Sequence, residues 1–117
     1  MPREDEHLQK ATHNERFADS LDLSKRCHLE WAITALFYAS IHYIEAYFSR
    51  YQVHCQDHNE RAREISRDPR IRTIFEDYRE LQTLSTAARY SAKVFAERDY
   101  TLHAKPILQR IKTATGN

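Results

Sequence analysis

The stretch ERDYTLH, residues 97–103, combines side chains that could act together on a phosphate ester. Arg98 can hold two phosphate oxygens at once through its planar guanidinium group. His103 can accept or donate a proton near neutral pH, because an unperturbed imidazole titrates there. Asp99 follows the arginine directly and could orient its neighbours. The stretch is therefore a candidate phosphate clamp with an acid/base group beside it.

Helix geometry restricts how Arg98 and His103 can meet. Residues five apart on one α-helix point about 140° away from each other at 3.6 residues per turn. We therefore expect Arg98 to lie before the last helix, with Asp99 as its N-cap. Pro106 should kink a helix that starts at residue 100, or else mark the first residue of a helix that leaves His103 in a loop. Two interpretations stay open: a phosphate site, or a capped helix start with two solvated side chains.

Composition indicates that these residues are carried by helices. The chain has 117 residues, which fits a single domain, with a structured core expected over about residues 5–112. It contains one glycine, Gly116, and three prolines, so turn-forming residues are scarce. Thirteen aromatic residues and 41% hydrophobic residues can fill a core. These features favour an all-α fold.

Apolar residues at helical spacing predict four to five helices that form a bundle. We expect them over about residues 4–20, 29–51, from Asp57 to Pro69, 70–88, and around Ile107 to Ile111. Asp57 and Glu60 have the spacing of a capping box. The second helix is apolar on both faces, one of which consists of small residues. It should therefore be central or shared with a partner subunit.

Cysteine content and charge favour a cytoplasmic protein with a modest basic end. Cys27 and Cys55 are too few to staple a secreted fold, and no charged segment followed by an apolar one opens the chain. The net charge is +1, but residues 88–117 carry six basic and two acidic side chains. The C-terminal end is therefore the better place for a phosphate-bearing partner.

Three segments together resemble the HEPN superfamily, in particular its small single-domain bacterial and archaeal members. They are WAITALFYASIHYIEAYF, HNERAREI and YRELQTLSTAARY, and the resemblance covers about residues 28–112. It implies a bundle of four to five helices that pairs as a homodimer, with the two copies facing each other across one cleft. Many HEPN proteins are metal-independent ribonucleases of toxin–antitoxin, defence or RNA-processing systems. Others are non-catalytic modules that bind a partner protein or a nucleotide.

The HEPN signature is an arginine, a polar residue directly after it, and a histidine separated from the arginine by four to six residues. Arg98, Asp99 and His103 match it. The resemblance implies RNA cleavage to a 2′,3′-cyclic phosphate and a 5′-hydroxyl, with His103 as acid/base, Arg98 as clamp and Asp99 as orienter. It calls for no metal or cofactor. It also implies a cognate antitoxin such as a nucleotidyltransferase.

Four further residues are candidates for contact with a substrate. Arg89 and Tyr90, after the fourth predicted helix, could clamp or stack on a nucleotide, or anchor the following loop. His58 and Arg61 recur in the resembled subgroup as an H-x-x-R turn. They could contact substrate, or fix the start of a helix and the dimer surface.

The remaining histidines favour structural roles. His42 lies on the second predicted helix, where we expect a buried imidazole bonded to a tyrosine or a carboxylate, with a role in a cleft as the alternative. His54, Cys55 and His58 offer metal-binding atoms, but their spacing matches no standard zinc pattern. We therefore predict no metal site.

Overall fold

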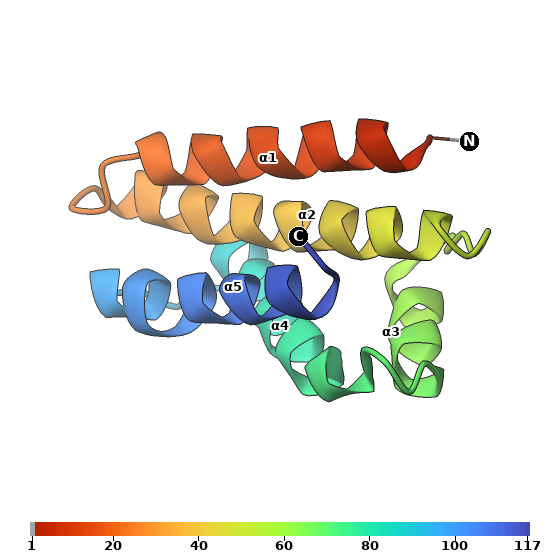
Figure 1. Ribbon diagram of the computed structural model, residues 1–117. Coiled ribbons are helices and arrows are strands. Elements are labelled where there is room, and N and C mark those ends of the chain that lie inside the picture. Colours follow the sequence, from red (N-terminus) through yellow and green to blue (C-terminus); the bar gives the residue numbers. More distant parts are fainter. Residues whose placement is uncertain (1) are drawn as a thin grey trace.

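The computed structural model of the chain describes residues 2–117 as an all-helical bundle (Figure 1). Helices α1 (Glu4–Ser20) and α2 (Arg26–Ser49) form a long antiparallel hairpin. Helices α4 (Phe75–Tyr90) and α5 (Lys105–Ala114) pack against α2. No strand occurs among the described residues. The predicted fold class is confirmed at this level.

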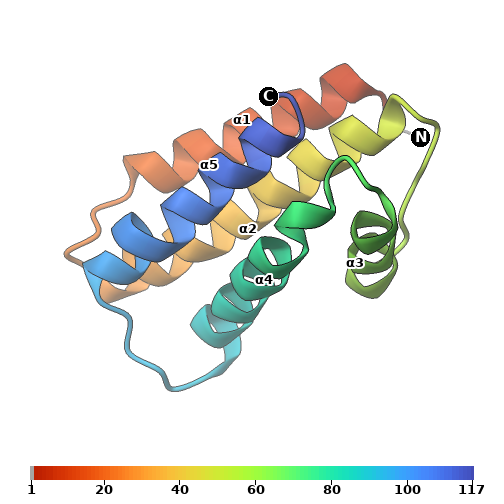
Figure 2. The same ribbon diagram turned by 60° about the horizontal axis from the view of Figure 1, so that its bottom comes forward.

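Three short elements complete the chain. Helix α3 (His58–Arg67) stands beside α4, near the end of α2 (Figure 2). A 3₁₀ turn, η1 (Arg72–Ile74), leads into α4, and a π-helical turn, η2 (Asp99–Ala104), leads into α5. None of the described helices is long and apolar enough to cross a membrane.

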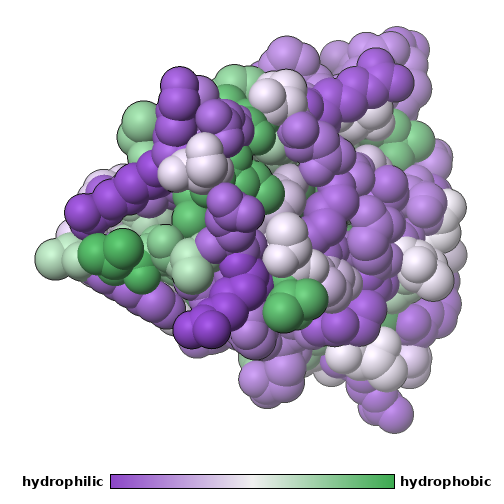
Figure 3. Space-filling model, turned by 90° about the vertical axis from the view of Figure 1, so that its left-hand side faces the viewer, coloured by the Kyte–Doolittle hydropathy of each residue, from purple (hydrophilic) through white to green (hydrophobic). Residues whose placement is uncertain are grey.

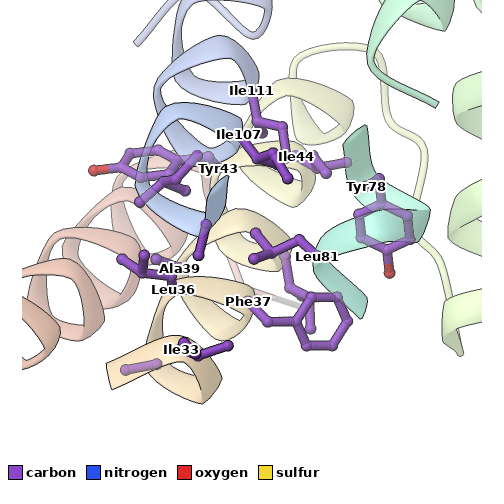
Figure 4. Packing of buried hydrophobic residues seen from close by; sticks show 14 of the residues in the cluster. Ile33, Leu36, Phe37, Ala39, Tyr43, Ile44, Tyr78, Leu81, Ile107 and Ile111 are labelled. Atoms are coloured by element: carbon purple, nitrogen blue, oxygen red, sulfur yellow. The ribbon is translucent and has the colours of Figure 1, made fainter. Parts of the chain in front are cut away.

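Helix α2 is the central element, as its two apolar faces predicted. Its small residues, such as Ala32 and Ala39, are fully buried and let neighbouring helices approach closely. Its large residues meet the rest of the core. Figure 4 shows Phe37 and Ile44 of α2 in the cluster that contains Leu81 of α4. The contacts of α2 with α1, α4 and α5 enclose most of its surface.

Local sequence signals account for several helix ends. Asp57 caps α3 by accepting a hydrogen bond from the Glu60 N–H at 2.8 Å. Glu60 accepts a hydrogen bond from the N–H of Gln56 at 3.1 Å, one residue before Asp57, the predicted capping-box partner. Both ends of α1 agree with the prediction, whereas α2 begins three residues earlier than expected.

The last helix differs from the prediction. Helical structure begins at Glu97, so Asp99 lies inside it and is not its N-cap. The Asp99 carboxylate instead accepts a hydrogen bond from the Ala96 N–H at 2.7 Å. Pro106 neither breaks the chain nor begins the helix. Directly before it the helix widens into the π turn, in which the Lys105 N–H bonds the Tyr100 carbonyl five residues back.

Glu15 connects three helices through one carboxylate. It accepts hydrogen bonds from Tyr43 Oη of α2 at 2.8 Å and, on α5, from Lys105 Nζ at 3.0 Å and Lys112 Nζ at 3.1 Å. Burial alone would raise the pKa of Glu15, but these hydrogen bonds outweigh it and hold the pKa below its usual 4.5. The ionised carboxylate therefore stabilises the packing of α1 and α5 on α2.

We expect Glu15→Gln to lower the free energy of unfolding at neutral pH, because the amide keeps the shape but loses the attraction to two ammonium groups. The folded pKa lies below the unfolded one. The stabilisation is therefore complete above pH 4.5. It is lost as the pH falls through the pKa of Glu15 in the folded protein, which is lower. Urea titrations over a pH series should show that the difference in free energy of unfolding between wild type and variant becomes smaller in acid. Glu80→Gln, at an exposed position of α4, is the control. A difference that persists unchanged in acid would contradict this assignment.

Candidate functional site

Arg98 and His103 lie at the end of the bundle where α2 begins and η2 starts. Figure 3 views this end, where apolar side chains interrupt a mostly hydrophilic surface. Both side chains are exposed, and neither forms a side-chain hydrogen bond or ion pair within residues 2–117. A guanidinium and an imidazole are thus free to meet a ligand at this end.

The π turn changes the angular relation between these two residues. Its hydrogen bonds join residues five apart, so positions i and i+5 lie one turn apart on a common side, as i and i+4 do in an α-helix. Arg98 directly precedes the turn and His103 is its fifth residue. The separation of about 140° expected for a regular α-helix therefore does not apply. The sequence prediction that Arg98 must lie off the helix was wrong for this reason.

Asp99 has a different partner from the one expected. Its half-buried carboxylate holds the Ala96 N–H at the start of the helix and forms no hydrogen bond with Arg98 or His103. Its contribution in the structure is to fix the backbone that leads into η2. It positions Arg98 through the chain rather than by direct contact.

Arg61 lies in the interior and not on a binding surface. Arg61 and Glu45 are only 6% and 5% exposed, and Arg61 Nε lies 2.7 Å from Glu45 Oε1. Arg61 Nη1 donates to Tyr78 Oη at 3.1 Å and lies 3.1 Å from His58 Nδ1. Burial lowers the pKa of His58, and the nearby positive charge of Arg61 lowers it further. These residues join α2, α3 and α4. Their contacts favour the structural alternative for Arg61 and His58 over contact with a substrate.

We expect Arg61→Leu to lower the free energy of unfolding by about 3–5 kcal/mol, because it leaves the buried Glu45 carboxylate without its partner. The double variant Glu45→Leu/Arg61→Leu should recover much of this loss, since no charge then remains buried. Arg67→Leu, which removes an exposed partner of Glu64 at 3.8 Å, should cost roughly 0–1 kcal/mol. Urea denaturation measures all three. Equal losses for Arg61→Leu and Arg67→Leu would contradict the buried pair.

His42 pairs with another histidine rather than with the tyrosine or carboxylate that was expected. Its Nδ1 lies 3.0 Å from Nδ1 of His7 on α1, so one ring donates a proton and the other accepts it. Burial lowers the pKa of His42 to about 4, with further contributions from His7, Lys10 and Arg61. Both rings are therefore neutral near pH 7, and the pair joins α1 to α2.

Arg89 is held by aromatic side chains. Its Nη1 donates to Tyr38 Oη at 2.8 Å, and its guanidinium carbon lies 5.6 Å from the centre of the Tyr38 ring and 5.2 Å from that of Tyr90. Its Nε is buried without a hydrogen-bond partner, and no carboxylate within residues 2–117 pairs with it. Arg89 thus lies close to two aromatic rings, one of which comes from α2.

The sequence reasoning missed the part of this site that α2 supplies. A pocket of about 230 Å³ lies between the start of α2 and the end of α4, and it is lined by Glu30, Trp31, Thr34, Ala88, Arg89 and Tyr90. Trp31 and Tyr38 are exposed, and they lie seven residues apart on α2. That spacing places two aromatic rings on one face of a helix. It was the feature of the sequence that could have indicated the contribution of α2 to this site.

No group of three or more histidine, cysteine, aspartate or glutamate side chains is placed to hold a metal ion within the described part of the chain. Burial raises the pKa of the Cys55 thiol to about 12, and the nearby negative charge of Glu45 adds to this. The thiol therefore stays protonated near neutral pH and is a poor ligand and nucleophile.

Comparison of the chain with protein-family models, curated proteins and solved structures finds no match. Assignment of a function therefore depends on the geometry at the shared end of α2, α4 and η2.

Proposed function

We propose that the chain is a HEPN-like, metal-independent endoribonuclease that uses His103 as acid/base and Arg98 as phosphate clamp. The observation that carries this proposal is the π turn η2, which brings residues five apart to a common side of an exposed helix. In a regular α-helix the same two side chains would diverge.

In the proposed reaction the imidazole of His103 accepts the proton of a ribose 2′-hydroxyl. The 2′-oxygen forms a bond to phosphorus, the bond from phosphorus to the 5′-oxygen breaks, and a proton passes to the leaving 5′-oxygen. Arg98 stabilises the negative charge that develops on the phosphate oxygens. The products are a 2′,3′-cyclic phosphate and a 5′-hydroxyl. In the proposed homodimer, the second copy of the Arg98–His103 pair supplies the acid for the leaving group.

Two features support a catalytic over a purely structural role for this pair. Arg98 is exposed and has no ion-pair partner within residues 2–117, so its charge is free to meet a phosphate. The helix also continues through Pro106, so His103 stays on an ordered turn. A non-catalytic module that binds a partner protein or a nucleotide remains the alternative. Burial of Arg98, or a break in the helix at Pro106, would have favoured the non-catalytic module.

Cleavage of labelled structured RNA by purified protein in excess EDTA tests the proposal. We expect wild type to produce cyclic-phosphate ends, and His103→Ala to cleave roughly 10²- to 10⁴-fold more slowly, the range typical of acid–base catalysis. Arg98→Ala should also be strongly impaired. His13→Ala and Arg63→Ala remove an exposed histidine and an exposed arginine from α1 and α3, and they should cleave like wild type.

Two results would count against this function. Equal cleavage by wild type and His103→Ala would remove His103 from the mechanism, and loss of all activity in EDTA would show a metal requirement. Absence of cleavage by wild type would favour the binding module.

A further inference from the structure

We propose that Trp31, Arg89 and Tyr90, with Tyr38 as the hydrogen-bond partner of Arg89, form a base-binding pocket that holds one unpaired nucleobase at the same end of the bundle as the proposed cleavage site. The identity of the ligand as RNA rests on the proposed function. The pocket itself rests on the exposure, charge and shape described below. We call these four residues the aromatic pocket.

Beyond its first turn, α2 is exposed only at this surface. Between Leu29 and Ser49, Trp31 and Tyr38 are the only exposed residues of the helix, at 57% and 40%. They share one face, because residues seven apart on an α-helix are separated by about two turns. Folding thus buries nearly all of α2 and leaves two aromatic rings uncovered beside the end of α4.

The charge of Arg89 is not compensated by a neighbouring carboxylate. Arg70 is a useful comparison, because it also lies over an exposed aromatic ring, that of Tyr51, at 3.8 Å. Arg70 Nε, however, is paired with Asp68 Oδ1 at 3.1 Å. Arg89 has Tyr38 Oη as its hydrogen-bond partner and keeps a buried Nε without one. A cation of this kind is suited to an anionic ligand.

The size and lining of the pocket favour a single planar ring. Its volume of about 230 Å³ is smaller than the roughly 300–1,000 Å³ of sites that enclose a whole drug-sized ligand. Glu30 also lines the pocket; its carboxylate lies 3.4 Å from Arg26 Nε and has further acceptor positions for the N–H groups of a base. We therefore assign the ring to the pocket and the attached phosphate to Arg89.

Single-stranded RNA matches these features better than a protein partner does. Unpaired bases stack on aromatic side chains and on arginine planes, which are the groups gathered here. Tyr90, at 79% exposure, is the most accessible of them. The loop over residues 91–96 connects Tyr90 directly to the segment that carries Arg98. In the proposal, a strand with one base in the aromatic pocket continues toward Arg98 and His103.

Trp31 fluorescence tests the proposal, because it is the only tryptophan of the chain. We expect AMP to quench its emission in a saturable way, whereas ribose 5-phosphate, which has the phosphate but no base, should not. Tyr90→Ala and Arg89→Gln should each weaken AMP binding by roughly 5- to 150-fold, the range for loss of one stacking partner. Tyr51→Ala removes the exposed ring beside Arg70 and should bind AMP like wild type.

The outcomes separate this inference from the proposed cleavage. His103→Ala should bind AMP normally even though it cleaves RNA much more slowly. Quenching by AMP without RNA cleavage by wild type would leave the base-binding pocket standing and remove the nuclease. Three results would overturn the pocket: no quenching by AMP, equal quenching by ribose 5-phosphate, or normal AMP binding by Tyr90→Ala with a native circular dichroism spectrum. Trp31 emission that shifts with protein concentration alone would indicate that a second copy covers the surface, and would also overturn it.

Discussion

The burial of α2 on nearly all sides is the constraint on which the rest of the structure depends. A helix that is apolar all round must be covered by several partners, and here α1, α4 and α5 provide the cover. Alanines such as Ala32 and Ala39 make this possible, because small side chains allow close approach of neighbouring helices. Trp31 and Tyr38, the two exposed side chains between Leu29 and Ser49, are therefore informative about function.

Buried polar groups fix how the other helices sit on α2. Glu15 connects α1 to α2 and α5, and the ion pair of Arg61 with Glu45 connects α3 to α2. A charge in the interior is tolerated only with a partner in good geometry. Each link therefore selects one register of the packed helices, which nonpolar contacts alone would specify less sharply.

The candidate site combines a rigid support with an irregular turn. Helices α2 and α4 carry Trp31, Tyr38 and Arg89 on packed elements, whereas Arg98 and His103 lie around a π turn. Such turns are frequent at functional sites because they place side chains that a regular helix would separate. The proposed nuclease and the proposed base-binding pocket use surfaces at the same end of the bundle. The nuclease depends on proton transfer and phosphate binding, whereas the pocket depends on stacking of a base on aromatic rings.

The sequence by itself determined the helical class, the approximate helix boundaries, the central place of α2 and the cap at Asp57, because spacing and capping are local properties. Only the tertiary structure decided the partners of Arg61, His42 and Arg89, which come from helices distant in the sequence. It also decided the π turn before Pro106. An apolar repeat tells which face of a helix is buried, but not which polar groups meet across helices. It also gives no sign of a local change in the hydrogen-bond register of a helix.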